Sequence, residues 1–207
     1  YLMKHPEIAA EMSDRYQDLQ AAQEDQASTD AIRKIGLKAF FDPAIAFVTG
    51  PANAKNTLVE FYDYDCPYCR ASLPAIEKYY AAHKQDTRFS LIEFPLPALH
   101  GPGAALAAKV SMAARLQPDR YIAFHFALMG APDQIDTAAI TAAAEKAGMD
   151  MKKLALDMQD PDIQKRIDEA HALARRSHID GTPTFIFNGK IHAGAVDEPT
   201  LDALMKS

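Results

Sequence analysis

The sequence predicts an α/β fold in which an all-helical insertion separates the two halves of one β-sheet. Residues 56–65 (NTLVEFYDYD) and 88–96 (RFSLIEFPL) are rich in β-branched and aromatic residues, with a helical segment between them. Residues 101–178 are Ala-rich and have a helical hydrophobic period. Asn188-Gly189, between TFIF and KIHAG, supplies the two positive φ angles of a tight hairpin turn.

The first predicted strand leads directly into the cysteines Cys66 and Cys69. The helix begins at Pro67, which the first helical turn tolerates because an N–H at that position has no intrahelical partner. A helix that connects two neighbouring strands makes those strands parallel. The sequence therefore places both cysteines at the start of a helix, at the carboxyl end of a strand.

The Ala-rich region is predicted to form an insertion of four or five helices. Glycines and prolines divide it, at Gly101, Gly103, Pro118, Gly130, Pro132, Gly148 and Pro161. The chain then returns to the sheet with the hairpin and ends in a short helix, EPTLDALMKS. The predicted organisation is a sheet domain of residues 42–100 and 179–207, with an inserted helical domain of residues 101–178.

Residues 1–41 have a different pattern and are predicted to form a helical arm. Apolar side chains recur at helical spacing among charged residues, at Leu2, Ile8, Met12, Tyr16 and Leu19. A polar stretch, QAAQEDQASTD, follows, and then a second short helix, DAIRKIGLKAFFD, ends before a proline. The arm either packs on its own domain or pairs with other copies. Five spaced apolar residues are poorly suited to folding back alone, so we favour self-association.

Composition limits the classes of function. Apolar residues make up 48% of the 207-residue chain and charged residues 24%, as in ordinary globular proteins. The net charge is -6, and without a Lys/Arg stripe the sequence gives no reason to expect nucleic-acid binding. The longest apolar runs, such as AIAFV, are too short to span a bilayer. The chain begins at Tyr1 rather than Met, so we expect an exported protein whose signal has been removed.

The two cysteines, separated by two residues, allow three interpretations. A structural bridge across so short a ring would stabilise the chain by only about 2 kcal/mol. A structural zinc site needs four ligands, whereas this pair offers two, and the histidines His171, His178 and His192 would have to complete it. The third interpretation is a redox couple, which a CxxC at a strand-to-helix junction favours.

The position of the pair at a helix N-terminus predicts different roles for its two members. Unpaired N–H groups and the partial positive charge there favour a thiolate, so the pKa of Cys66 is predicted to be low. Cys69, one turn further in, is predicted to be the less exposed, resolving thiol. The sequence therefore favours a reactive dithiol/disulfide couple.

Four segments resemble the DsbA family of thioredoxin-fold proteins: LVEFYDYDCPYC, FPLPALHGPGAALAA, YIAFHFALM and HIDGTPTFIFNGK. They span roughly residues 56–195 and imply a thioredoxin fold with an inserted helical domain, in agreement with the element order above. The N-terminal segment, with its YLMKHPE opening, resembles the subgroup typified by the suppressor of copper sensitivity protein C. That subgroup includes homotrimers, built through this arm, that shuffle wrong disulfides, and copper(I) binding through the cysteines is associated with it.

The resemblance also implies roles for further residues. Glu60 matches an acidic residue beneath the active site, where it would relay the Cys69 proton. Thr182-Pro183 matches a cis-proline loop that faces the cysteines and would pair with a client peptide beside Cys66. The dipeptide Pro67-Tyr68 would also meet the client. Tyr68 replaces the His or Gly of many relatives, which argues against a strongly oxidising couple.

These observations together predict a thiol-disulfide oxidoreductase of the periplasm that requires no cofactor. We expect a homo-oligomeric, trimeric disulfide isomerase with misfolded or reduced client proteins and a membrane-bound electron donor as partners. Two alternatives remain open: a monomeric disulfide oxidase, and a copper(I)-binding protein with Cys66 and Cys69 as ligands. The oxidase and isomerase potentials differ by only about 60 mV, too little to distinguish from sequence.

Overall fold

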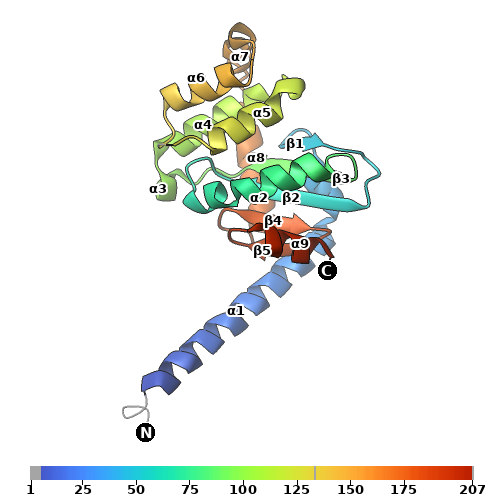
Figure 1. The fold of residues 1–207 in the computed structure, drawn as a ribbon, viewed down its shortest axis with the longest axis vertical. Helices are drawn as coiled ribbons and strands as arrows, with labels where there is room; N and C mark the ends of the chain where they lie inside the picture. Colours follow the sequence, from blue (N-terminus) through green and yellow to red (C-terminus); the bar gives the residue numbers. More distant parts are fainter. Residues whose placement is uncertain (1–5, 133, 207) are drawn as a thin grey trace.

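The computed structural model describes residues 6–132 and 134–206 and confirms the α/β thioredoxin-like fold (Figure 1). The strands are β1(Ala46–Thr49), β2(Asn56–Tyr62), β3(Thr87–Glu93), β4(Thr184–Phe187) and β5(Lys190–Ala193). They form one sheet in the order β1-β3-β2-β4-β5. β2 and β3 are parallel and flank α2(Pro67–His83) in sequence, as predicted, whereas the other pairs are antiparallel.

The hairpin turn is confirmed, but the sequence analysis missed a strand. Asn188 and Gly189, between β4 and β5, have φ angles of 50° and 89°. The missed strand is β1, which pairs with the edge of β3 through only four residues. Its sequence, AFVT, lies within an apolar run that is too short for its period to indicate a strand.

The insertion consists, within the described residues, of five helices that follow the short α3(Pro97–His100). They are α4(Pro102–Ala114), α5(Pro118–Met129), α6(Thr137–Lys146), α7(Met151–Asp157) and α8(Ile163–Arg176). The first half of α8 packs in the core of the insertion, whereas Ala170, Leu173 and Ala174 pack with β2 and β3 residues. α8 therefore bridges both parts, and the division at residue 178 stays a prediction.

Apolar clusters cover both faces of the sheet. On one face, α2 and α9(Glu198–Lys206) pack against Leu58, Phe89 and Phe185. On the other face, α8 and the 3₁₀-helix η2(Leu37–Phe41) pack against Val59, Phe61 and Ile92. Across residues 6–132 and 134–206, no helix combines the length and apolarity needed to cross a membrane.

The N-terminal arm is one helix, α1(Pro6–Ile35), which projects away from the rest of the molecule (Figure 1). The prediction of two helices separated by a polar stretch is wrong. Small and polar residues such as Ala, Gln and Glu form helices well, so a lack of large apolar side chains does not end one. The second predicted helix is the end of α1 followed by η2, with Gly36, at a φ of 87°, between them.

The two ends of α1 have different surroundings. Ile32 is buried in the same cluster as Phe40 and Phe41, so the last turns of α1 belong to the core. Towards the N-terminus, Met12, Tyr16 and Leu19 are 62%, 61% and 57% exposed, and Ile8 is half-buried. The fifth residue of the predicted stripe, Leu2, lies outside the described residues. A stripe of large apolar side chains on a projecting helix therefore faces solvent in the single chain.

Candidate functional site

The cysteine pair lies where the sequence predicts it, at the start of α2. Cys66 is the N-cap residue, with φ of -73° and ψ of 120°, and Pro67 follows in the first turn. The Cys66 N–H donates to the Asp63 carbonyl oxygen over 3.1 Å, which closes a turn between β2 and α2. Both cysteines are free thiols. The strand-to-helix turn thus delivers the Cys66 sulfur to the helix N-terminus.

The predicted difference in exposure between the two cysteines is wrong, because each exposes only 1% of its surface. The loop at Thr182-Pro183 explains the burial of Cys66: its Sγ lies 3.1 Å from the Thr182 carbonyl oxygen and, as a thiol, donates to it. The Thr182-Pro183 peptide bond is cis, as the resemblance implied. In the described conformation the reactive sulfur is therefore covered by this loop.

Local hydrogen bonds separate the acidities of the two thiols. The pKa of Cys66 is lowered to about 5, chiefly because the Cys69 thiol donates to it, with Thr182 and the N–H groups of Cys69 and Tyr68 adding to the effect against the cost of burial. The pKa of Cys69 is raised well above its ordinary value by burial, by the hydrogen bond with Cys66 and by the charge of Glu60. At neutral pH the pair is therefore a Cys66 thiolate beside a Cys69 thiol.

Glu60 lies beneath the pair, between the sheet and α2. It is on the face of β2 shared with Leu58 and Tyr62, and Leu58 packs against α2. Glu60 is 3% exposed, its Oε2 has no hydrogen-bond partner, and burial raises its pKa to about 8. A carboxyl group that titrates near neutrality suits proton transfer with Cys69, although the relay itself stays a prediction.

The raised pKa of Glu60 also predicts how stability depends on pH. The folded protein favours the protonated acid, so this contribution is complete below pH 4.5 and is lost as pH rises through about 8. Glu60→Gln cannot ionise, and we expect its free energy of unfolding to fall less than that of the wild type between pH 5 and 8. Urea denaturation across this range measures the difference. Glu93, whose pKa burial also raises to about 8, keeps part of the slope in both proteins. Parallel profiles would contradict the assignment.

The other residues implied by the resemblance surround the sulfurs. Pro67 is exposed, and Tyr68 is 65% exposed beside the cysteines. Thr182 Oγ1 is buried, and the Thr182 carbonyl oxygen faces Cys66. These residues stand where a client chain would approach Cys66, and their role in binding it stays a prediction.

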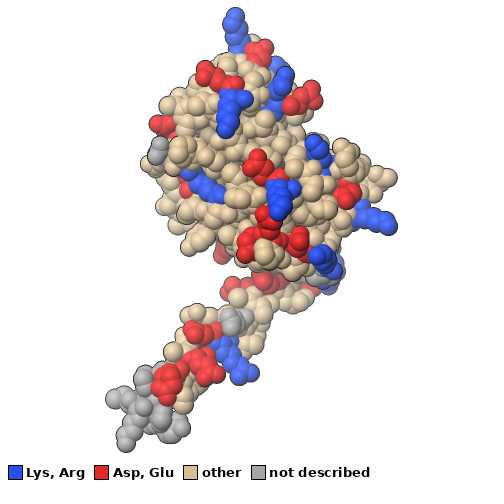
Figure 2. All heavy atoms as spheres, in the orientation of Figure 1, with Lys and Arg blue, Asp and Glu red and all other residues tan. Residues whose placement is uncertain are grey.

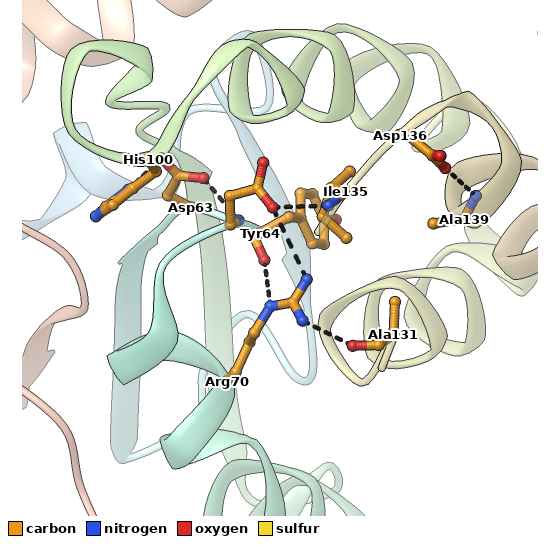
Figure 3. Close-up of polar contacts among 9 residues, drawn as sticks. Asp63, Tyr64, Arg70, His100, Ala131, Ile135, Asp136 and Ala139 are labelled. Carbon is orange, nitrogen blue, oxygen red and sulfur yellow. Dashed lines mark hydrogen bonds and ion pairs between the residues drawn. The ribbon is translucent and has the colours of Figure 1, made fainter. Parts of the chain in front are cut away.

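Sequence reasoning missed a polar network that ties the active-site turn to the insertion (Figure 3). Asp65 accepts a hydrogen bond from Ile135 N over 2.8 Å, and Arg70 lies 3.9 Å from the same carboxylate oxygen. Arg70 also donates to the carbonyl oxygens of Tyr64 and Ala131, over 2.9 and 2.7 Å. The acidic residues just before Cys66, in YDYDC, were the available signal.

A glycine makes room for this network. A Cβ at Gly103 would lie 2.0 Å from the Ile135 carbonyl oxygen and 2.5 Å from Asp65 Oδ2. We expect Gly103→Ala to lower the free energy of unfolding by about 1–3 kcal/mol, because overpacking forces the contact apart. Urea denaturation measures this. Gly181→Ala is the control: nothing lies within 4 Å of its Cβ, and a change below about 0.5 kcal/mol is expected. Equal losses in both variants would contradict the packing argument.

A second buried network lies behind the pair, between the sheet and α4 and α5. Tyr62 donates to Glu93 and lies 3.0 Å, oxygen to oxygen, from the Tyr121 hydroxyl. Tyr64 OH is 3.0 Å from both Ser111 Oγ and His125 Nδ1. Burial lowers the pKa of His125 to about 3, so this imidazole is neutral. The network satisfies polar groups that would otherwise be costly to bury.

Two predictions remain to be compared with the structure: the absence of a basic stripe and the preference for a redox couple over a structural zinc site. On the face drawn in Figure 2, Lys and Arg side chains are interspersed with Asp and Glu. Among the residues that the structure describes, no three or more His, Cys, Asp or Glu side chains gather as a metal site. His171 instead packs on Phe94, with 4.6 Å between the ring centroids.

Comparisons with known proteins agree with this geometry. A family model described as DSBA-like thioredoxin domain matches residues 57–206. A thioredoxin-like oxidoreductase from Silicibacter pomeroyi is 34% identical, with a TM-score of 0.70, over 81% of this chain and 93% of that one. A linker-deletion mutant of Proteus mirabilis ScsC is 25% identical, with a TM-score of 0.76, over 100% of this chain and 95% of that one.

A periplasmic thioredoxin-like protein from Salmonella enterica serovar Typhimurium is 31% identical, with a TM-score of 0.70, over 80% of this chain and 90% of that one. The curated relatives are longer proteins. The Na(+)/H(+) antiporter NhaA 3 of Salinispora tropica is 31% identical over 166 residues, which are 80% of this chain. The match covers 25% of that antiporter, so the chain spans about a quarter of the length of such relatives.

Proposed function

Because this chain belongs to the DsbA-like thioredoxin domain family, whose fold is that of thiol-disulfide oxidoreductases, we propose that it is a homotrimeric disulfide isomerase acting on exported proteins. The observation that carries the proposal is the exposed apolar stripe of Met12, Tyr16 and Leu19 on the projecting helix α1. An exposed stripe at helical spacing is buried when helices associate. Association through α1 would join several active sites in one particle.

The chemistry follows from the acidities of the two thiols. The Cys66 thiolate attacks one sulfur of a wrong client disulfide, so that a Cys66–client bond forms, the client bond breaks and a client thiolate leaves. In isomerisation, another client thiolate attacks this mixed disulfide and restores the Cys66 thiolate, with no net change in electrons. In reduction, Cys69 gives up its proton and attacks Cys66, which closes the Cys66–Cys69 bond and releases a reduced client.

Groups around the cysteines would assist the reductive route, in which Cys69 attacks the mixed disulfide. Cys69 must lose a proton despite its raised pKa, and we propose that Glu60 accepts it in its ionised form, which a pKa of about 8 leaves as the minor form at neutral pH. The Thr182 carbonyl that covers Cys66 is a backbone acceptor for an extended client segment, and it is free for that role once Cys66 is ionised and no longer donates to it. Once oxidised, the couple must be reduced again, and we propose a membrane-bound electron donor for this step.

We propose the periplasm as the place of action. Disulfide exchange between proteins is useful in an oxidising compartment, and cytosolic thiols are mostly kept reduced. The similarity to a protein described as periplasmic supports this location. No cofactor is needed, since the two sulfurs carry the electrons.

The function is tested by running both directions of exchange side by side. The reduced chain is incubated with a scrambled disulfide protein, and recovery of that protein's activity is followed. In parallel, the oxidised chain is incubated with a reduced dithiol peptide, and the native mass is measured by light scattering. We expect isomerase activity and a mass three times that of the chain. Fast peptide oxidation by a monomer would instead establish the alternative, a DsbA-like oxidase.

We propose copper(I) binding as a second property of the same couple. Cys66 and Cys69 are hydrogen-bonded to one another, so two soft sulfur ligands lie side by side. Competition with a chromophoric copper(I) chelator under reducing conditions measures the affinity. A protein that lacks both thiols should not compete, and equal competition by it would remove the proposal.

A further inference from the structure

The Asp63 carboxylate is a buried junction just before the active-site cysteine. Its side chain is 0% exposed. Oδ1 accepts a hydrogen bond from Asp65 N over 2.9 Å, and Oδ2 accepts one from Leu96 N over 2.8 Å. Oδ2 also lies 2.8 Å from Nδ1 of His100, the last residue of α3 (Figure 3). A carboxylate with these partners fixes the position of the turn after β2 relative to the segment of Leu96 and His100 after β3.

The backbone of the same residue contacts the nucleophilic cysteine. The Asp63 carbonyl oxygen accepts from Cys66 N over 3.1 Å, and the Asp63 backbone also lowers the pKa of Cys69, against the larger effect of burial. A small rotation of the Asp63 backbone would therefore displace Cys66 from the helix N-terminus. The hydrogen bonds of the Asp63 side chain oppose that rotation.

Among residues 6–132 and 134–206, His100 is the side chain that hydrogen-bonds to this carboxylate. Its side chain is 15% exposed, and its backbone N–H donates to the Leu96 carbonyl oxygen over 2.9 Å, so the imidazole is held in place by α3. Leu96 and His100 follow β3, whereas Asp63 follows β2. The pair thus fastens the ends of two neighbouring strands beneath the active-site turn.

We propose that Asp63 and His100 are positioning residues that hold the 63–66 turn, and with it Cys66, in the geometry that stabilises the Cys66 thiolate. The inference rests on the proposed exchange chemistry at Cys66. Neither residue need touch the client: they act through the turn. Loss of the His100 hydrogen bond should make the reduced form less favourable, because reduction creates the thiolate that the turn stabilises.

The test compares variants of His100 that differ in one donor. His100→Leu keeps apolar bulk and removes the donor, and His100→Ala is a second variant without it. His100→Asn places an amide N–H at the same distance from the backbone as Nδ1 and should restore the bond. His83→Ala is the control, because His83 forms an exposed pair with Asp86 at 3.2 Å far along α2. Each protein is equilibrated with glutathione, and the ratio of reduced to oxidised protein is measured.

We expect the equilibrium constant for reduction by glutathione to fall about tenfold in His100→Leu and His100→Ala, because a displaced Cys66 would lose about one hydrogen bond to its thiolate, which exists only in the reduced form. His100→Asn and His83→Ala should stay close to the wild type. Thermal unfolding is recorded for every variant. A lowered melting temperature with an unchanged equilibrium constant would show a purely structural pair and overturn the proposal, as would failure of His100→Asn to restore the wild-type constant. If neither donor-less variant folds, a wild-type constant in His100→Asn together with a tenfold fall in Asp63→Asn supports it, and no fall in Asp63→Asn overturns it.

Failure of the proposed function gives a different result. If the wild-type chain does not equilibrate with glutathione at all, the exchange chemistry is absent and the variants share that defect. If the wild type equilibrates and the His100 variants match it, only the positioning inference fails.

Discussion

Replacing Cys66 by serine is expected to abolish thiol-disulfide exchange, whereas replacing Cys69 by serine should leave the first step intact and trap a mixed disulfide. The difference follows from the two acidities: the pKa of Cys66 is about 5, and that of Cys69 is raised well above its ordinary value. Only Cys66 is a thiolate that can attack at neutral pH. Non-reducing electrophoresis with a disulfide-containing client should show the covalent adduct for Cys69→Ser alone.

The same variants separate the causes of the low pKa of Cys66. The hydrogen bond from the Cys69 thiol is its largest cause, and a serine hydroxyl at position 69 can still donate, whereas an alanine cannot. The rate of Cys66 alkylation should rise through a midpoint near pH 5 in the wild type and at a clearly higher pH in Cys69→Ala than in Cys69→Ser. Equal midpoints in the two variants would mean that the helix N-terminus, rather than residue 69, sets the acidity. An adduct formed by Cys66→Ser would contradict the assignment of the nucleophile.

Charging the exposed stripe of α1 is expected to convert the oligomer into a monomer and to remove most isomerase activity. Met12, Tyr16 and Leu19 lie on one face of the helix and are each more than half exposed in the single chain. In an association through α1 these side chains would be buried, and a buried unpaired carboxylate is strongly unfavourable. The triple variant Met12→Glu, Tyr16→Glu, Leu19→Glu should therefore show the mass of one chain by light scattering and little recovery of a scrambled client.

The control for this experiment adds the same charge to the opposite face. Ala10, Gln17 and Ala21 are exposed and are displaced from the stripe by about half a helical turn. Changing these three residues to Glu should leave both mass and activity unchanged. Substitution tests the arm better than deletion does. Ser28 and Ile32 are buried, so a deletion that removed them would disturb the core. If the stripe variant keeps the wild-type mass, the arm does not assemble the protein.

Local patterns in the sequence were enough to predict several elements of this protein. The β-branched and aromatic residues of NTLVEFY predict β2, the NG dipeptide predicts the hairpin, and a proline after Cys66 predicts that a helix starts there. These signals act within a few residues, so they survive without knowledge of the fold. The motif resemblance added the cis Thr182-Pro183 bond, which no local pattern requires.

Contacts between segments that are distant in the sequence could be found only in the folded molecule. Thr182, which contacts Cys66 and buries it, is 116 positions away in the sequence, and Asp63 and His100, which also contact one another, are 37 positions apart. The raised pKa of Glu60 depends likewise on the residues that bury it, and the end of α1 is part of the core because Ile32 packs there. Burial and hydrogen-bond partners are properties of the packed molecule. The sequence therefore identified the reactive cysteines, but not the neighbouring groups that set the pKa values of their thiols.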